Sequence, residues 1–246
     1  MKFLLIGAVA IMAGCLTAPV DDQTLRANQG DMLAQFQLGL DNANLESENH
    51  DFKAAKKWYR KAANQGHVMA QYNLGYMLVT GTGVDKNPTE AFNWYQKAAE
   101  QGFSEAQFNL SLMYKFGDGV TENTDEAFKW ALRAAEQGHA NAQYNLGVWN
   151  GRGEGRPKDD NEAFKWYLEA AKQGNENAAI IVGGRYHSGQ GVAKNVILGH
   201  AWLLQSDSDI AKRYLALFGQ KMTERELEES QSLAINCRQS NYINCY

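Results

Sequence analysis

Tryptophan recurs at a fixed interval of 36 residues, and this period constrains the fold more than any other feature of the chain. The five tryptophans in the series are Trp58, Trp94, Trp130, Trp166 and Trp202. A glycine series keeps the same step at Gly30, Gly66, Gly102, Gly138 and Gly174. A period of this size is typical of solenoids, in which each repeat is one small structural unit. We therefore expect repeated units near residues 31–66, 67–102, 103–138, 139–174 and 175–210.

Each repeat divides into two helical patterns with a glycine turn between them. In residues 67–102, Ala70, Leu74 and Leu78 recur on one face of a helix. The segment Gly81-Thr82-Gly83-Val84 then breaks that helix, because paired glycines permit a helix C-cap and a tight turn. Equivalent pairs follow at Gly117/Gly119, Gly153/Gly155 and Gly189/Gly191. The first repeat departs from the pattern, with Asn42-Ala43-Asn44-Leu45 in place of the glycines.

The second helix of each repeat begins with a recognisable capping signal. Short polar residues occupy the expected N-cap at Asn87, Asn123, Asp159 and Asn195. An acid follows three residues later at Glu90, Glu126 and Glu162, which suits the positive end of a helix. Pro88 lies at the first helical position, where proline is tolerated.

These patterns predict an all-α solenoid of about five helix-turn-helix repeats over residues 25–210. A helix pair of this size cannot bury its own apolar face, so its stability must come from stacking on its neighbours. Residues 25–30 resemble the end of a second helix and are expected to form a partial cap. At the other end, Thr223 and Glu226 form a capping-box pattern that opens a helix through about Ile235. Residues 211–246 are thus expected to form capping helices and a tail.

Three blocks of the repeat carry a resemblance to a known family. They are Ala70-Gln71-Tyr72-Asn73-Leu74-Gly75, then Gly81-x-Gly83-Val84, then Glu90-Ala91-x-x-Trp94-x-x-Lys97-Ala98-Ala99-x-x-Gly102. This sequence resembles the Sel1-like repeat, a relative of the tetratricopeptide repeat, over four or five units. The resemblance implies a right-handed α/α superhelix and a role as an adaptor, receptor or regulator in a complex.

The first fourteen residues read as a targeting segment. Lys2 precedes a twelve-residue apolar run, which is shorter than the roughly 20 residues that a spanning helix needs. The run ends Met12-Ala13-Gly14-Cys15 and resembles the bacterial lipobox, so we expect residues 1–14 to be a signal peptide and Cys15 to carry lipid. An ordinary secretory signal is the alternative. Leu16 follows the cysteine, and in bacterial lipoproteins the absence of Asp at that position favours the outer membrane; residues 15–24 would then form a short tether.

With Cys15 assigned to lipid, Cys237 and Cys245 remain as an even pair. In a chain that leaves the reducing cytosol, such a pair favours a disulfide, here one that closes the C-terminal tail. Two free thiols, or a metal site lacking its other ligands, are the alternatives.

No catalytic or metal-binding motif is visible. The histidines are His50, His67, His139, His187 and His200, and none stands in an H-E-x-x-H arrangement. No serine precedes a lysine by three residues, and G-x-S-x-G and Walker A motifs are absent. The stretch 151–155 imitates a phosphate loop, but its place in the repeat makes it a turn. We expect no enzyme activity, no metal and no cofactor.

The chain has a formal net charge of -4, or -5 without residues 1–14, which carry Lys2 and no acid. This argues against nucleic acid as a partner, since a polyanionic backbone selects a basic surface. Protein partners remain open.

Aromatic side chains recur on the first helix of each repeat, opposite the stacking face. In related solenoids the first helices line an inner groove, so these aromatics are candidate partner-binding residues. The candidates are Phe36, Tyr72, Tyr76, Phe108, Tyr144 and Trp149. The alternative is that they pack between successive first helices. Trp149 is individual, because Met77, Met113 and Arg185 occupy its position in other repeats, and it either fills a gap or contacts a ligand.

The function predicted from the sequence is a non-enzymatic protein-protein interaction module. It would be lipid-anchored in the bacterial envelope, facing the periplasm from the outer membrane, and would regulate or recruit another protein. A narrower version is an immunity or inhibitor protein that neutralises a periplasmic toxin. The competing classes are a cell-wall or β-lactam hydrolase and a structural protein that assembles with itself.

Overall fold

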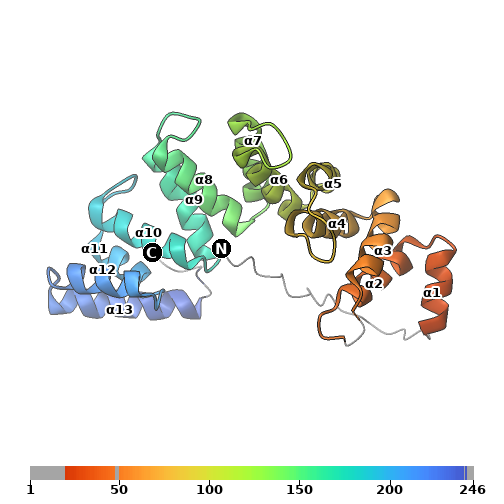
Figure 1. The fold of residues 1–246 in the computed structure, drawn as a ribbon. Helices are drawn as coiled ribbons and strands as arrows, with labels where there is room; N and C mark the ends of the chain where they lie inside the picture. The colour runs from red at the N-terminus through yellow and green to blue at the C-terminus, as the bar shows by residue number, and fades with distance from the viewer. Residues whose placement is uncertain (1–19, 48–49, 241, 243–246) are drawn as a thin grey trace. The chain divides into compact units, whose positions relative to one another are not determined.

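The computed structural model describes residues 20–47, 50–240 and 242. Within these residues the chain forms thirteen helices, α1 to α13, and no strand (Figure 1). The prediction of an all-α fold is confirmed. The predicted signal peptide, Cys15 and Cys245 lie outside the described residues.

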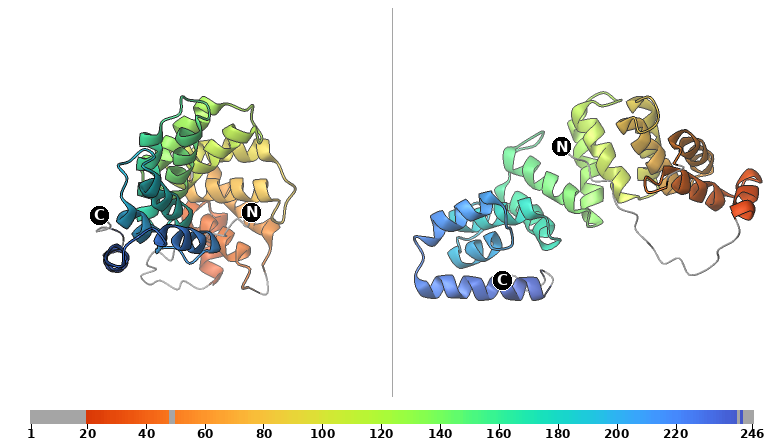
Figure 2. Two further views of the ribbon diagram at one scale, coloured as in Figure 1. Left: turned by 90° about the vertical axis from the view of Figure 1, so that its left-hand side faces the viewer. Right: turned by 60° about the horizontal axis from the view of Figure 1, so that its bottom comes forward.

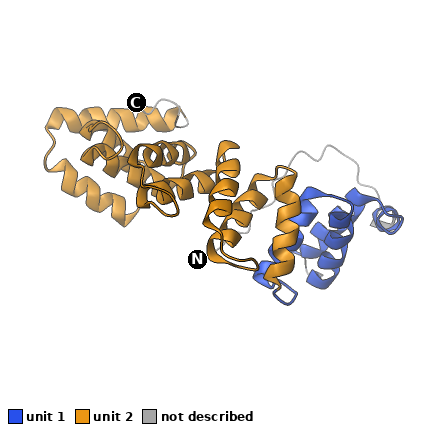
Figure 3. Ribbon diagram, turned by 90° about the horizontal axis from the view of Figure 1, so that it is seen from above, with its two compact units in different colours: residues 1–86 blue, residues 87–246 orange. Residues whose placement is uncertain are grey.

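The chain forms two compact units, residues 1–86 and 87–246 (Figure 3). The first contains α1 (Val20–Asn28), α2 (Met32–Ala43), α3 (Phe52–Asn64) and α4 (Val68–Thr80). The second contains α5 (Pro88–Glu100), α6 (Ser104–Phe116), α7 (Thr124–Glu136), α8 (Ala140–Arg152), α9 (Asp160–Lys172), α10 (Glu176–Ser188), α11 (Val196–Leu203), α12 (Asp209–Gly219) and α13 (Glu224–Gln239).

The helices keep the period that the tryptophans predict. The first helices α4, α6, α8 and α10 begin at residues 68, 104, 140 and 176, and the second helices α3, α5, α7, α9 and α11 begin at 52, 88, 124, 160 and 196. Each repeat is therefore a pair of helices, as predicted, because the same start and stop signals recur every 36 residues.

The predicted capping residues begin the second helices. The Asn123 side chain accepts a hydrogen bond from the Glu126 amide at 3.1 Å, and the Asp159 side chain accepts from the Glu162 amide at 2.9 Å. Asn87 and Asn195 cap α5 and α11 in the same way. Each cap satisfies an amide that helix geometry leaves without a partner.

The two glycines of each turn have different structural roles. Its first glycine, such as Gly117 with φ of 69°, takes the left-handed conformation that ends the first helix. Its second glycine lies against the opening residue of the preceding second helix: Gly119 against Pro88, Gly155 against Thr124 and Gly191 against Asp160. The second glycine thus lets successive repeats approach closely, since any side chain there would overlap the neighbouring helix.

A ladder of buried glutamines, which the sequence analysis missed, also joins successive helices. Gln143 Nε2 on α8 donates to the backbone carbonyl of Ala135 on α7 at 3.1 Å, and Gln173 Nε2 donates to Gln143 Oε1 at 2.6 Å. Gln107 and Gln137 repeat the contact at 2.6 Å. The signal was present in the sequence, because Gln35, Gln71, Gln107 and Gln143 are 36 residues apart.

The first unit uses the same contact at its N-terminal end. Gln35 Nε2 donates to the backbone carbonyl of Ala27 on α1 at 2.9 Å, and Gln65 Nε2 donates to Gln35 Oε1 at 2.7 Å. In the bond between Gln35 and Ala27, α1 supplies the carbonyl that the second helix of the preceding repeat supplies elsewhere. This agrees with the partial cap expected at residues 25–30.

The repeat pattern ends at α11, and two further helices cover that end of the second unit (Figure 2). Ala211 of α12 packs with Ile180 of α10 and Leu203 of α11, all less than 9% exposed. The capping box of Thr223 and Glu226 opens α13, as predicted, although the helix continues to Gln239. No helix in the described part of the chain is long and apolar enough to cross a membrane.

Cys237 on α13 is 3% exposed and disulfide-bonded. The partner cysteine lies outside the described residues, so the predicted pairing with Cys245 stays a prediction.

Candidate protein-binding surface

One face of the first helices in the second unit remains partly exposed. We define the row face by the residues at equivalent positions of α6, α8 and α10: Phe108, Leu112 and Phe116; Tyr144, Val148 and Arg152; Ile180, Gly184 and Ser188. Spacings of four residues place each group of three on one side of its helix. On α6 and α8 none of these side chains is fully buried. At α10 the pattern changes, because Ile180 is covered by α12.

Phe116 is the most exposed aromatic on the row face. Its side chain is 74% exposed at the C-terminal end of α6. A single exposed apolar residue is ordinary on a protein surface, but Phe116 lies on the same side of α6 as half-buried Phe108 and Leu112. Large aromatic groups that are accessible beside apolar neighbours are the usual anchors of protein contacts.

Two predicted partner-binding residues of the row face are half-buried. Phe108 stacks on the imidazole of His139 with ring centres 4.6 Å apart, and Tyr144 meets Tyr167 edge-on at 5.8 Å. Both also contact a buried cluster that contains residues of their own repeat and of the next one. Each ring therefore packs against the core on one side and stays partly accessible, and its role in binding a partner stays a prediction.

The first unit holds three further candidates, all half-buried. Phe36 stacks on His67 at 4.1 Å, an arrangement equivalent to that of Phe108 and His139. Tyr72 and Tyr76 lie one helical turn apart on α4.

Trp149 belongs to the core of the second unit. Its side chain is 7% exposed and packs beside Phe128, with ring centres 6.4 Å apart. Lys115 Nζ lies 5.6 Å from its ring centre and forms an ion pair with Glu154 at 3.0 Å. The hydrogen bond from Lys115 is the main cause that lowers the pKa of Glu154. This burial favours the gap-filling role for Trp149.

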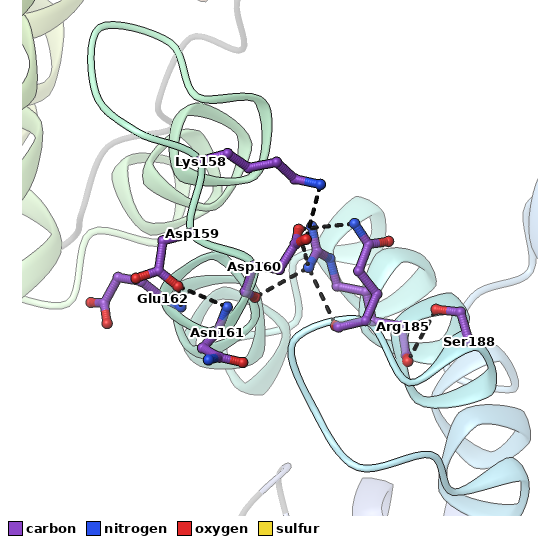
Figure 4. Close-up of polar contacts among 8 residues, drawn as sticks. Lys158, Asp159, Asp160, Asn161, Glu162, Arg185 and Ser188 are labelled. Carbon is purple, nitrogen blue, oxygen red and sulfur yellow. Dashed lines mark hydrogen bonds and ion pairs between the residues drawn. The ribbon is translucent and has the colours of Figure 1, made fainter.

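Arg185 occupies the repeat position of Trp149 and makes a polar contact there that the sequence did not predict (Figure 4). Its side chain is 9% exposed. Nη1 lies 3.3 Å from Asp160 Oδ1 and donates to the backbone carbonyl of Asp160 at 3.2 Å. Lys158 and Gln190 also reach the Asp160 carboxylate, each at 2.9 Å, and the bond from Lys158 is the main cause that lowers its pKa. These contacts join α9 to α10.

Three histidines make hydrogen bonds that support the fold. His67 and His139 are N-caps of α4 and α8, accepting at Nδ1 from the amides of Ala70 and Ala142 at 3.2 Å. His200 is buried, with Nδ1 2.9 Å from Ser230 Oγ. In the described ranges no group of three or more histidine, cysteine or acidic side chains could hold a metal ion.

The row face ends in a cavity of about 310 Å³ beside α10 and α12. It is lined by Gly184, His187, Ser188, Lys194, Val196, Phe218, Lys221 and Met222. The His187 ring stacks on Phe218 at 3.8 Å. Burial lowers the pKa of His187 to about 4, helped by nearby His200 and Lys194, so its imidazole is neutral at pH 7. The sequence signal for this cavity was Gly184, where other repeats have Tyr76, Leu112 and Val148.

Comparison with known proteins identifies the repeat. The Sel1 repeat matches at residues 33–67, 68–103, 104–139, 140–175 and 177–206. No curated protein matches the chain closely enough to count as a relative.

Solved structures that resemble the chain include two with the same type of repeat. A Sel1 repeat protein from Oxalobacter formigenes is 34% identical with a TM-score of 0.71, over 79% of this chain and 57% of that one. A protective antigen present in uropathogenic Escherichia coli strains, displaying an SLR fold, is 27% identical with a TM-score of 0.56, over 91% of this chain and 56% of that one. The chain thus spans little more than half the length of either protein.

Proteins built from this repeat are generally protein-interaction modules, and the fold is typically a non-enzymatic scaffold. The family match covers most of the chain, and the helices keep the repeat period throughout it. The chain therefore belongs to the Sel1 repeat family.

Proposed function

We propose that this protein binds another protein through the row face of its second unit, as a non-enzymatic, lipid-anchored component of the bacterial envelope. The observation that carries the proposal is the exposed ring of Phe116 on the same side of α6 as the half-buried side chains of Phe108 and Leu112. A partner that covers these groups would gain apolar burial without any rearrangement of the helices.

A photo-crosslinking amino acid at position 116 tests the binding role in intact cells. We expect a reproducible protein adduct from position 116, because the side chain there would lie inside the interface. The matched control is the same amino acid at Ile235, which is 54% exposed on α13 and outside the row face. No adduct, or the same adducts from both positions, would contradict the proposal.

Substitution of Phe116 provides a second test once the partner has been identified. Phe116→Ser should weaken binding at least about tenfold, the loss typical of an aromatic anchor. The melting temperature should not fall, because the side chain contributes little to the core when it is 74% exposed. Ile235→Ser is the control and should leave affinity unchanged.

The envelope location rests on the sequence of residues 1–15. We expect the wild type to incorporate labelled palmitate and to fractionate with the outer membrane. Cys15→Ser should lose the label, because lipid attachment requires the thiol. A wild-type protein without label would refute the lipid anchor and leave the binding role intact.

An immunity protein would be a narrower form of the same function. It would appear as a toxin among the adducts from position 116 and as toxin sensitivity on deletion of the gene. Turnover of nitrocefin or muropeptides by the purified protein would instead support the hydrolase alternative and contradict the proposal.

A further inference from the structure

The cavity beside α10 exists because one repeat lacks a side chain that the others have. A Cβ on Gly184 would have no atom within 4 Å, so the space above this residue is open. The equivalent residues Leu112 and Val148 fill that space on α6 and α8. Ile180, one turn earlier on α10, is covered by α12, whereas Gly184 and Ser188 line the cavity.

The walls of the cavity combine an apolar interior with positive charge. Phe218, Met222 and Val196 supply apolar surface, and the Phe218 ring is held by its stack on His187. Two lysines, Lys194 and Lys221, line the same cavity, and none of its lining residues is acidic. A ligand in the cavity would therefore contact apolar side chains and two lysine ammonium groups at once.

One polar atom of the cavity wall has no partner. His187 Nε2 is buried, and no described residue lies within hydrogen-bonding distance of it. Because the atom is hidden from solvent, a ligand in the cavity would meet the apolar wall and the two lysines, not this nitrogen. Ser188 is less available, because its hydroxyl donates to the backbone carbonyl of Arg185 at 3.3 Å.

We propose that this cavity receives a large apolar side chain from an acidic segment of the partner protein, with the flanking carboxylates facing Lys194 and Lys221. A cavity of 310 Å³ lies at the small end of the range of ligand sites, about 300–1,000 Å³, and suits one large side chain with its backbone. The opposite charges favour an acidic sequence and disfavour a basic one. The inference rests on the proposed protein-binding role of the row face, which Gly184 continues onto α10.

The test uses the full chain with labelled methionine methyl groups, because Met222 lines the cavity. Four short peptides serve as probes: Gly-Glu-Phe-Glu-Gly, its lysine counterpart Gly-Lys-Phe-Lys-Gly, its uncharged counterpart Gly-Ser-Phe-Ser-Gly, and Gly-Glu-Ala-Glu-Gly. We expect the first to shift the Met222 methyl resonance with saturation, and the other three to bind at least about tenfold more weakly.

Two variants test whether the peptide binds in the cavity and whether its lysines select the peptide's charge. Gly184→Leu fills the cavity with the residue that α6 carries at the same position, so the fold should be kept while the methyl shift is lost. Lys194→Glu with Lys221→Glu should reverse the preference toward the lysine peptide. The control for charge is Lys53→Glu with Lys57→Glu, two exposed residues of α3 in the other unit, which should leave binding unchanged.

The proposal is overturned if no peptide shifts Met222, if Gly184→Leu binds as well as the wild type, or if the uncharged and acidic peptides bind equally. Failure here with a specific adduct from position 116 would remove the cavity and keep the proposed function. Saturable binding of the acidic peptide without any adduct from position 116 would support the cavity as a binding site and would contradict the proposed role of Phe116 on the row face.

Discussion

At Gly191 a single methyl group would collide with the backbone of the neighbouring repeat. A Cβ built there would overlap the carbonyl oxygen of Asp160, the first residue of α9, and the residue also has φ of 72°. We expect Gly191→Ala to lower the free energy of unfolding by about 3 kcal/mol or more, from left-handed strain and overlap together.

Gly174→Ala is the matched control for that substitution. Gly174 has φ of 81°, but a Cβ on it would have no atom within 4 Å. Its replacement should cost only the conformational strain, about 1 kcal/mol. Urea denaturation of the two variants measures the difference, and equal losses would show that the close approach at Gly191 is unimportant.

The buried arginine predicts an asymmetry between two other substitutions. Arg185→Met introduces the residue that repeats carry at Met77 and Met113, and the Asp160 carboxylate, which is 28% exposed, would keep its contacts with Lys158 and Gln190, so the loss should be small. Asp160→Ala instead leaves a guanidinium that is 9% exposed without its carboxylate, at a cost on the order of 1–3 kcal/mol. Chemical denaturation should therefore rank Asp160→Ala as the more damaging change, and the opposite order would refute this account.

Residue roles were the hardest to predict from the sequence. The 36-residue period shows that Trp149 and Arg185 share a repeat position with two methionines. It does not show that the Trp149 ring enters the core or that the Arg185 guanidinium pairs with Asp160. Those outcomes depend on which neighbours the adjacent repeat presents. The residue types of the adjacent repeat can be read from the sequence, whereas the side-chain contacts depend on how closely the helices approach.

At the scale of the helix, the capping residues set where each second helix begins. Asn123→Ala removes the hydrogen bond to the Glu126 amide and should lower the free energy of unfolding by about 1 kcal/mol. Asn123→Asp keeps the acceptor and serves as the control. Thermal unfolding followed by circular dichroism distinguishes the two, and equal stability of both variants would mean that the cap contributes nothing.

The helices of the repeats were predictable because each carries its own local start and stop signals. Asn123 and Gly117 act within a few residues of their own helix ends, so no tertiary information is needed to read them. The cavity beside Gly184 was not predictable in this way. It depends on where α12 packs against α10, and α12 lies beyond the last repeat, where no period indicates its neighbours.

For the whole molecule, four histidines make stability depend on pH. Burial lowers the pKa of His67, His139, His187 and His200, with His187 reaching about 4. Below about pH 6.5 the unfolded chain binds protons that the folded chain does not, so acidification favours unfolding. We expect the melting temperature to fall steadily from pH 7 toward pH 4.

His187→Phe tests the largest of these contributions. The ring would keep its stack on Phe218, while the proton uptake of the unfolded state at this residue would disappear. The fall in melting temperature between pH 6.5 and 4 should therefore become smaller than in the wild type. An unchanged slope, or a wild-type melting temperature that rises on acidification, would contradict the assignment.

Two kinds of contact recur every 36 residues: those made by the buried glutamines, and those between turn glycines and the first residues of helices. Whole repeats could therefore be added or removed without loss of these contacts. Removal of residues 104–139 would bring Gln143 to the carbonyl of Ala99 and Gly155 to Pro88, the partners that Gln107 and Gly119 now have. A shortened chain should therefore still fold cooperatively, whereas deletion of half that length would leave the contacts across the deletion unmatched. Gene duplication and loss could change the reach of this scaffold without any redesign of its joints.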